Sequence, residues 1–279
     1  MAFFSEIPAM SSIEFKLLRN IIHEQTGIYY ELEKMDILID KITPLLLDQG
    51  MESFIDYYYL LKYDSHYTDE WHHVYDAISV QETYFGREFD HIETLVKKII
   101  PKLANENDCQ SLKIWSAACA SGEEPLTIVI SLSESGWFEH IPIEIYASDF
   151  SSKAILKAQA GLFGNYSFRH WPKKLLDKYF VIKDHQYQII HSIHERIQWK
   201  LLNLNNKDDI AQMAGMNIIF CRNVFIYFSD IAIRKTIRHF YECMTRPGYL
   251  FTGVSESLLK FTDDFDMQEI GSSFVYVKE

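Results

Sequence analysis

From about residue 112 onward, short apolar segments alternate with segments of helical periodicity. LKIWSAA (112–118) and IEIYASD (143–149) have the length and composition of buried strands. PLTIVISLSES (125–135) and SKAILKAQAG (152–161) follow them with the pattern of helices. This alternation is typical of a mainly parallel sheet covered by helices on both faces. Ligands of such sheets bind beyond the carboxyl ends of the strands.

The first 76 residues have a helical pattern throughout and contain no strand pattern. The segment 11–27 has apolar residues on one stripe, a possible N-cap at Ser11 or Ser12, and a glycine, Gly27, where the helix should end. Three more helical patterns follow. We therefore predict a small all-α domain at residues 1–76.

Residues 77–279 are predicted to form a second, α/β domain. We expect a Rossmann-like sheet, mainly parallel, which a closing antiparallel strand at SFVYVK (273–278) completes. Residues 187–203 are rich in strand signals, and we place a small β-subdomain insertion at about 180–200.

The chain is acidic, with a formal net charge of −12, and residues 1–76 hold 14 acidic against 5 basic side chains. Such a chain is a poor partner for a phosphate backbone, so we expect no nucleic-acid partner.

The spacing of Cys109, Cys119, Cys221 and Cys243 predicts reduced thiols, and the histidines form no metal-ligand pattern. The sequence has neither a signal peptide nor an apolar run of about 18 residues, which favours a cytoplasmic protein without membrane insertion.

The first strand of the second domain leads into AACASGEEP (117–125), a turn with one glycine and two adjacent carboxylates. Pro125 suits the first turn of a helix, so the helix should start near Glu124, and Ser121 with Glu124 has the form of a capping box. Glu123 and Glu124 could simply complement the helix dipole. Two carboxylates would repel a pyrophosphate, however, so a dinucleotide is a poor ligand here.

Two further strand ends carry polar side chains. Asp149 ends the second strand, where it fits either as an acceptor of ribose hydroxyls or as a helix cap. Asn223 and Tyr227, in FCRNVFIYF (220–228), supply an amide and a phenol. Carboxylates, an amide and aromatic rings suit a positively charged adenosine ligand without phosphates. The strand ends therefore predict S-adenosylmethionine as the cofactor.

Six motifs occur in one order along this domain: ETYFGRE (82–88), WSAACASGEEP (115–125), ASDFSSKAILKAQAG (147–161), LLNL (201–204), FCRNVFIYF (220–228) and PGYLFTGVSESL (247–258). Together they closely resemble those of the chemotaxis receptor glutamate methyltransferases of the CheR type. The helical segment before them is similar to the N-terminal domain of that family.

The resemblance implies a class I methyltransferase that esterifies glutamate side chains in the cytoplasmic domain of chemoreceptors and releases S-adenosylhomocysteine. It also leads us to expect a monomer. Arg87 and Tyr227 match positions that would orient the incoming glutamate. The positions that match cofactor contacts are Gln81, Thr83, Arg87, Ala117, Glu123, Asp149, Asn203, Leu204, Asn223 and Val224. Of the two adjacent glutamates, we expect Glu123 to meet the cationic cofactor and Glu124 to start the helix.

The chain departs from the family pattern in three places. Gln81 stands where the family commonly has asparagine. The family usually presents a basic helix to the acidic receptor, whereas Lys34 and Lys41 are the two basic residues in the matching segment, 33–50. Compensating charge could come from six cations of the second domain: Lys153, Lys157, Arg169, Lys173, Lys174 and Lys178. No glycine lies between residues 165 and 214, so we expect an enzyme that does not depend on a receptor C-terminal pentapeptide.

Three other interpretations remain open from the sequence. The chain could methylate another protein or a small carboxylic acid, which the acidic N-terminal domain favours. It could bind S-adenosylmethionine as a non-catalytic signalling module, although it retains the polar residues of the motifs. A nicotinamide dehydrogenase fits worst, because of the acidic turn after the first strand.

Overall fold

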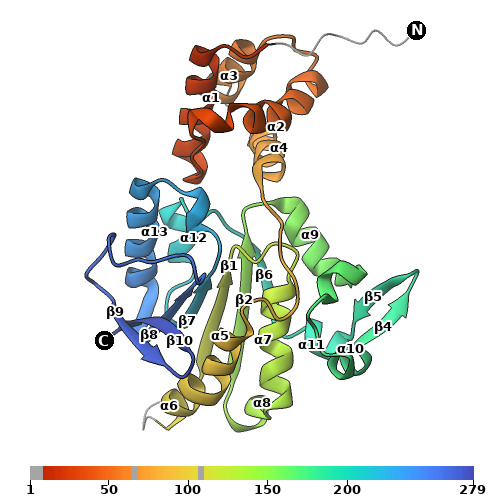
Figure 1. The fold of residues 1–279 in the computed structure, drawn as a ribbon, viewed down its shortest axis with the longest axis vertical. Helices are drawn as coiled ribbons and strands as arrows, with labels where there is room; N and C mark the ends of the chain where they lie inside the picture. Colours follow the sequence, from red (N-terminus) through yellow and green to blue (C-terminus); the bar gives the residue numbers. More distant parts are fainter. Residues whose placement is uncertain (1–8, 65–67, 106–109) are drawn as a thin grey trace.

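The computed structural model describes residues 9–64, 68–105 and 110–279. Figure 1 shows a helical domain joined to a larger α/β domain. The helices are α1 (Ser12–Thr26), α2 (Met35–Asp48), α3 (Phe54–Tyr63), α4 (Thr68–Ile78), α5 (Phe89–Thr94), α6 (Ile100–Ala104), α7 (Glu123–Glu134), α8 (Trp137–His140), α9 (Ser152–Ala160), α10 (Lys173–Tyr179), α11 (His191–His194), α12 (Lys207–Ala211) and α13 (Asp230–Cys243), with short 3-10 or π segments η1 (Leu32–Lys34), η2 (Leu95–Ile99), η3 (Asn165–Phe168) and η4 (Phe225–Tyr227). The strands are β1 (Leu112–Ala117), β2 (Ile143–Asp149), β3 (Leu162–Phe163), β4 (Phe180–Lys183), β5 (Gln186–Ile189), β6 (Ile197–Leu201), β7 (Met216–Cys221), β8 (Met244–Thr252), β9 (Asp266–Ile270) and β10 (Ser273–Lys278).

Helices α1–α4 form the N-terminal part, as the sequence pattern predicts. Ser11 caps α1 in a capping box with Glu14, whose carboxylate accepts from the Ser11 amide at 2.8 Å. Gly27 ends α1 with φ of 79°, a conformation that favours glycine. The last helix ends at Ile78, and a domain boundary at residues 76 and 77 stays a prediction. The helices share a core that includes Phe15, Leu18, Ile22, Leu38, Ile42, Phe54 and Tyr57.

A seven-stranded sheet forms the centre of the second part, in the order β6-β2-β1-β7-β8-β10-β9. The pairs from β6 to β8 are parallel, and β10 is antiparallel to both β8 and β9. The expected fold class is therefore confirmed. The sequence analysis missed β9, because its polar sequence DMQEI lacks the apolar alternation of a half-buried strand.

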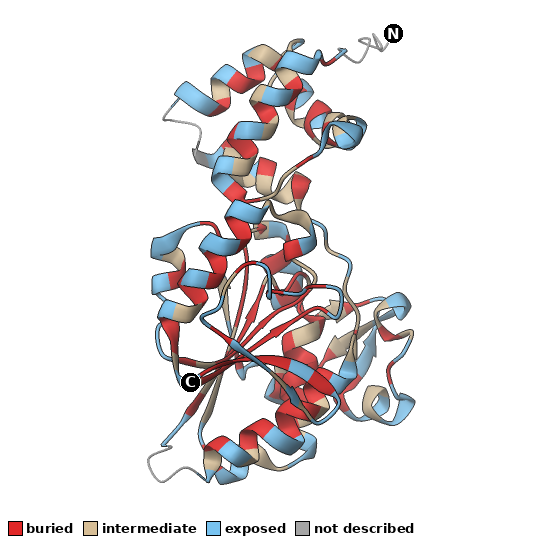
Figure 2. Ribbon diagram, turned by 60° about the vertical axis from the view of Figure 1, so that its left-hand side comes forward, coloured by how far each residue is buried: buried red, intermediate tan, exposed pale blue. Residues whose placement is uncertain are grey.

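Consecutive residues of β1 face opposite sides of the sheet, as the pleat requires. Ile114 packs into a core shared with α5 and α7, whereas Trp115 packs into a second core shared with α12 and α13. Figure 2 shows the strands buried along most of their length. Because both faces are covered, the carboxyl ends of the parallel strands are left as the place where polar side chains can gather.

A separate three-stranded antiparallel sheet has the order β3-β5-β4. It extends from residue 162 to 189, and thus differs from the β-subdomain expected at about 180–200. Residues 197–201 form β6, which pairs in parallel with β2 at the edge of the main sheet. The alternating pattern of residues 187–203 is therefore shared between two sheets, with the short helix α11 between them.

The thiols of Cys119, Cys221 and Cys243 are free and buried, which agrees with the predicted reduced state. Cys109 lies outside the described residues. Within the described part of the chain, no helix combines the length and the apolar composition needed to span a bilayer.

Asp76, at the end of α4, joins the two domains by receiving hydrogen bonds from the start of α9. Its carboxylate accepts from the Ser151 hydroxyl at 2.7 Å, the Ser152 hydroxyl at 3.0 Å and the Lys153 amide at 3.1 Å. Burial alone would raise the pKa of Asp76, but these hydrogen bonds outweigh it and lower the pKa below its ordinary value. The carboxylate also lies at a helix N-terminus, where negative charge is favourable.

A second junction places the end of α1 against the loop before α13. Residues 27–29 pair with residues 227–229 through main-chain hydrogen bonds, from the Tyr29 amide to the Tyr227 carbonyl at 2.9 Å and from the Ser229 amide to the Gly27 carbonyl at 3.2 Å. A Cβ atom at Gly27 would lie 3.0 Å from that of Ala232, so a side chain there would force the two segments apart.

We predict that Asp76→Ala lowers the free energy of unfolding at neutral pH by about 1 kcal/mol, a typical value for a lost helix cap. Because the folded-state pKa is depressed, the carboxylate stabilises the protein above its unfolded pKa of about 4, and this contribution is lost as the pH falls below that value. Urea unfolding at a series of pH values should therefore show a difference from wild type that shrinks in acid. Asp263→Ala removes an exposed carboxylate as the matched control, and an equal loss in both variants would contradict the prediction.

Candidate functional site

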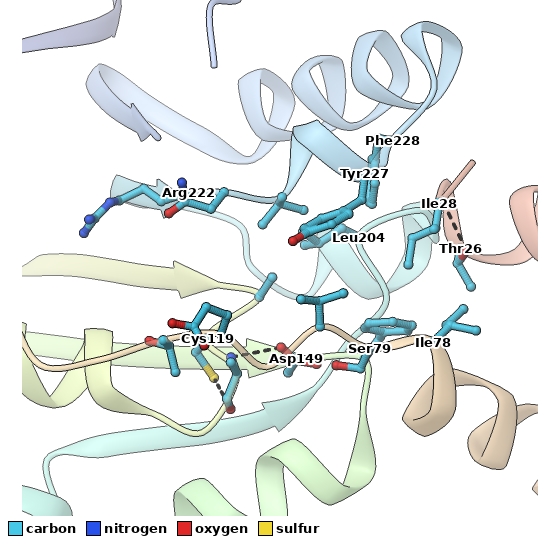
Figure 3. Close-up of a pocket in the computed structure, with 18 of the residues that line it drawn as sticks. Thr26, Ile28, Ile78, Ser79, Cys119, Asp149, Leu204, Arg222, Tyr227 and Phe228 are labelled. Atoms are coloured by element: carbon cyan, nitrogen blue, oxygen red, sulfur yellow. Dashed lines mark hydrogen bonds between the residues drawn. The ribbon is translucent and has the colours of Figure 1, made fainter. Parts of the chain in front are cut away.

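A cavity of about 320 Å³ lies between the carboxyl ends of β1, β2 and β7 and the helical domain. Figure 3 shows side chains from both domains around it. The wall from the second domain includes Thr83, Arg87, Ala118, Cys119, Ala120, Glu124, Asp149, Leu202, Asn203, Leu204, Arg222, Asn223, Val224 and Tyr227. The wall from the helical domain includes Thr26, Ile28, Tyr29, Tyr30, Lys34, Ile37 and Lys41.

The turn after β1 forms the floor of the cavity through residues 118–120. Ala118 and Ala120 both have positive φ, at 58° and 48°. Ala117 is almost fully buried and does not reach the wall, so the turn meets the cavity one residue later than predicted. Gly122 has φ of 96°, and a Cβ atom there would lie 2.9 Å from the Trp199 ring. A glycine is therefore needed at position 122, because the turn packs closely against Trp199.

Asp149 holds this turn and also lines the cavity. Its carboxylate accepts from the amides of Ala120 at 3.0 Å and Ser151 at 2.9 Å. The N-cap of α9 is Ser151, whose hydroxyl accepts from the Ala154 amide, so Asp149 is not the helix cap. Burial raises the pKa of Asp149 to about 6, despite the opposing backbone hydrogen bonds.

The two adjacent glutamates have positions opposite to those expected. Helix α7 begins at Glu123 with Gly122 as its N-cap, and the predicted capping box of Ser121 with Glu124 does not form. Glu124 lines the cavity, whereas Glu123 is not on its wall and accepts hydrogen bonds from Ser121 and Ser167 at 2.8 and 2.9 Å. Successive helical residues project about 100° apart, so one of the pair must face away from the cavity.

Arg222, which the sequence analysis did not select, connects three parts of the site. Its side chain is 3% exposed, and it lies 3.2 Å from the carboxylates of both Glu88 and Glu124. Its guanidinium also donates to the Arg87 carbonyl at 2.5 Å. Burial raises the pKa of Glu124, while Arg222 and a hydrogen bond from Ser116 act in the opposite direction. An arginine directly after a buried strand was the signal that could have identified it.

The loop after β7 bends sharply at Asn223, which has φ of 59°. Glu256, another residue that the sequence analysis missed, holds this bend. Its carboxylate accepts from the amides of Asn223 and Gly253, both at 2.7 Å, and of Ile226 at 3.3 Å. Asn223, Val224 and Tyr227 all line the cavity, as predicted.

The segment before α5 places Thr83 and Arg87 on the cavity wall, as predicted. Arg87 donates to the Glu82 carbonyl at 2.7 Å. Gln81 is not on the wall. Its amide oxygen accepts from Lys157 at 2.8 Å, which turns the side chain toward α9 instead.

Asn203 and Leu204, after β6, also lie on the wall. The Asn203 amide donates to the Gln25 carbonyl at 2.7 Å and its oxygen accepts from the Asn205 amide at 2.9 Å. The side chain of Asn203 therefore joins this loop to α1. The main-chain amide and carbonyl of Asn203 are bonded to Asp209 and Asn206, so Leu204 is the residue of this pair that can offer apolar surface to a ligand.

The helical domain contributes to the same wall, which the sequence analysis did not predict. Tyr30 is buried, which raises the pKa of its phenol to about 12. Lys41 donates to the Ala77 carbonyl at 2.8 Å, and burial lowers the pKa of its ammonium. Separate sequence patterns for two domains give no indication that both line one cavity.

Comparison with known proteins identifies the ligand class. The all-alpha domain model of CheR methyltransferases matches residues 13–79, and their SAM binding domain model matches residues 81–274. Chemotaxis protein methyltransferase 2 of Vibrio cholerae is 33% identical over 96% of this chain and 94% of its own. Chemotaxis protein methyltransferase 1 of Pseudomonas aeruginosa is 28% identical over 95% and 98%, and the chemotaxis protein methyltransferase of Borreliella burgdorferi is 30% identical over 88% of both chains.

The cavity fits S-adenosylmethionine on its own chemistry. Asp149 and Glu124 supply carboxylates for a cationic ligand with hydroxyl groups, and Leu204 and Val224 offer apolar surface for its adenine. Among the residues that the structure describes, no group of three or more side chains is placed to bind a metal ion.

We predict that affinity for S-adenosylmethionine falls in acid. Protonation of Asp149, with its pKa of about 6, removes the charge that favours ribose hydroxyls and a cationic ligand, so binding should be about tenfold weaker at pH 5 than at pH 7. Calorimetric titration across this range checks the trend. The Asp149→Asn variant should bind S-adenosylmethionine weakly, and its affinity should depend less on pH, with the remaining dependence coming from Glu124. A pH dependence equal to that of wild type would contradict the assignment.

We also predict that Arg222→Met destabilises the protein by about 3–5 kcal/mol, because it leaves two carboxylates without their buried counter-charge. Without the guanidinium, the pKa of Glu124 should rise further, so cofactor binding should be lost at a higher pH than in wild type. Binding and unfolding measurements at several pH values test this. Arg222→Lys keeps a charge, so its stability and cofactor binding should lie between those of wild type and Arg222→Met. Wild-type stability and binding in Arg222→Met would show that the ion pairs are dispensable.

Proposed function

The chain belongs to the CheR methyltransferase family, and on that premise we propose that it methylates glutamate side chains of chemoreceptors. The products would be glutamyl methyl esters and S-adenosylhomocysteine. The observation that carries this proposal is that Arg87 and Tyr227 line the same cavity as Asp149 and Glu124. The two residues that we propose to orient the substrate carboxylate thus line the same cavity as the residues suited to the cofactor.

The proposed reaction requires no general base. A glutamate carboxylate is already ionised at neutral pH, since its ordinary pKa is about 4.3. S-Adenosylmethionine, when bound, supplies a methyl group activated by a sulfonium. One glutamate oxygen forms a bond to the methyl carbon while the carbon–sulfur bond breaks and its electron pair stays on sulfur. The protein has to orient the carboxylate in line with that bond and exclude water.

Arg87 and Tyr227 are suited to that orientation. The Tyr227 hydroxyl projects into the cavity (Figure 3), and the Arg87 guanidinium is attached to its own segment through Glu82. Both groups donate hydrogen bonds to a carboxylate without removing a proton from it. Tyr227 is also held through its carbonyl by Tyr29, so its position depends on the helical domain.

We propose that recognition of the receptor does not use its C-terminal pentapeptide. Pentapeptide-binding members of the family carry glycines in the small β-subdomain. In this chain the β4–β5 hairpin turns at Asp184 and His185, which have φ of 48° and 63°, so residues with side chains take even the positive-φ positions there. We further propose that the protein is cytoplasmic. We also propose that it is a monomer, because one chain supplies the described residues of the cavity wall.

A second candidate is methylation of a protein other than a chemoreceptor, which the acidic helical domain favours. Several cations that could compensate for it are already paired. Lys157 binds Gln81, and Arg169, Lys173 and Lys178 bind Glu82, Asp177 and Glu134.

Incubation with labelled S-adenosylmethionine and receptor cytoplasmic fragments tests the proposal. We expect base-labile label on receptor glutamate, and a kcat about 10²-fold lower for Arg87→Ala and for Tyr227→Phe, because each loses a group that orients the carboxylate. The affinity for S-adenosylhomocysteine should change much less for Tyr227→Phe.

Arg196→Ala and Tyr63→Phe change the same residue types at exposed positions and should keep wild-type kcat. Wild-type kcat in both site variants would exclude the assigned roles. Label on other proteins in preference to receptor fragments would favour the second candidate, and tight cofactor binding without transfer would indicate a non-catalytic module.

A further inference from the structure

A second hollow, of about 420 Å³, lies on the outer surface of the α/β domain at α12 and α13. Figure 1 shows these helices side by side, below the helical domain. Six residues line the hollow: Lys207, Arg234, Lys235, Arg238, His239 and Glu242. Four permanent cations and one carboxylate therefore gather on a chain whose net charge is −12.

The protein itself fixes two of these cations in position. Arg234 donates to the carbonyls of Phe261 at 2.6 Å and Lys260 at 2.7 Å, and Lys235 donates to the Asn205 carbonyl at 2.7 Å. Neutral carbonyls orient the side chains and leave their positive charges uncompensated. The cations are thus held in place before any ligand arrives, which lowers the entropic cost of binding.

The other two cations, Arg238 and Lys207, are exposed. Arg238 has a single ion pair, with Glu242 at 3.2 Å, and both side chains are largely exposed, so this pair is weak. Lys207 is exposed at the first turn of α12. A ligand with more than one negative charge can compete with a single exposed carboxylate for these groups.

His239 forms the base of the hollow. It is 9% exposed, it lines the hollow, and its Nδ1 has no hydrogen-bond partner within the described residues. Burial lowers its pKa, and the neighbouring Lys235 lowers it further, so the ring is neutral at pH 7. This ring nitrogen is itself shut off from solvent, so His239 closes the base of the hollow by packing, and the cations at the rim are the groups that can meet a ligand.

We propose that this hollow is a binding site for a small phosphate-bearing anion. Lys207 and Arg238 contact its oxygens from the rim of the hollow. The guanidinium fork of Arg238 matches the geometry of a phosphate. A docked acidic protein fits less well, because Asp208 and Glu242 lie beside the same cations and would repel an extended acidic surface.

The site lies directly behind part of the cofactor cavity. Lys235 holds the Asn205 carbonyl, and Thr236 donates to the Leu204 carbonyl at 3.4 Å. Leu204 itself lines the cofactor cavity. Titrations are therefore best made on protein saturated with S-adenosylhomocysteine, which also prevents an anion from entering that cavity.

Calorimetric titration with inorganic pyrophosphate at constant ionic strength tests the proposal. We expect saturable binding of one pyrophosphate, weakened at least about tenfold in the double variant Lys207→Gln/Arg238→Gln, which loses both rim contacts. Lys97→Gln/Lys173→Gln removes the same charge from two other exposed helical cations that are paired with carboxylates, and it should bind as wild type.

Two further ligands distinguish the source of the phosphate. Tighter binding of inorganic phosphate than of ATP would indicate the free ion, and the reverse would indicate a nucleotide. No saturable binding of any of these anions up to about 10 mM would overturn the proposal. Equal weakening in both double variants would overturn it as well, and so would tighter binding of a glutamate-rich peptide that depends on Lys207 and Arg238.

Discussion

The buried guanidinium of Arg222 is the interaction on which the site depends. It lies at the end of β7 and pairs with Glu124 at the start of α7 and Glu88 at the start of α5. Two carboxylates in this interior would be strongly unfavourable without it. The same guanidinium donates to the Arg87 carbonyl, so the segment that carries one of the proposed orienting groups is attached to the centre of the sheet.

The cavity is a product of both domains. Main-chain pairing of residues 27–29 with residues 227–229 attaches α1 to the loop that carries Tyr227, and Asp76 attaches α4 to α9. Tyr29 and Tyr30 thereby become part of the cavity wall. A movement of the helical domain would change the position of Tyr227, so the shape of the cavity and the proposed orientation of the substrate depend on the same junction.

The sequence predicts the fold well, because strand–helix alternation is a property of many residues and tolerates local error. It also predicts that Asp149, Asn223 and Tyr227 meet, since the strand ends of a parallel sheet must converge. It does not predict which of Glu123 and Glu124 faces the cavity. That choice depends on the residue at which α7 starts, and a shift of one position turns a side chain by about 100°. Gln81 was predicted to contact the cofactor but is not on the cavity wall, because Lys157 from α9 binds its side chain.

The acidity of the helical domain does not by itself oppose a carboxylate substrate. Coulomb interactions between exposed charges are screened within about 10 Å at ordinary ionic strength, so the charges near the cavity matter more than the net charge of the domain. Lys34 and Lys41, at the start and middle of α2, both line the cavity. Arg87 lies on the same wall. An approaching glutamate would therefore meet positive charge at the cavity, while the acidic side chains elsewhere on the helices limit which surfaces of a partner can come close.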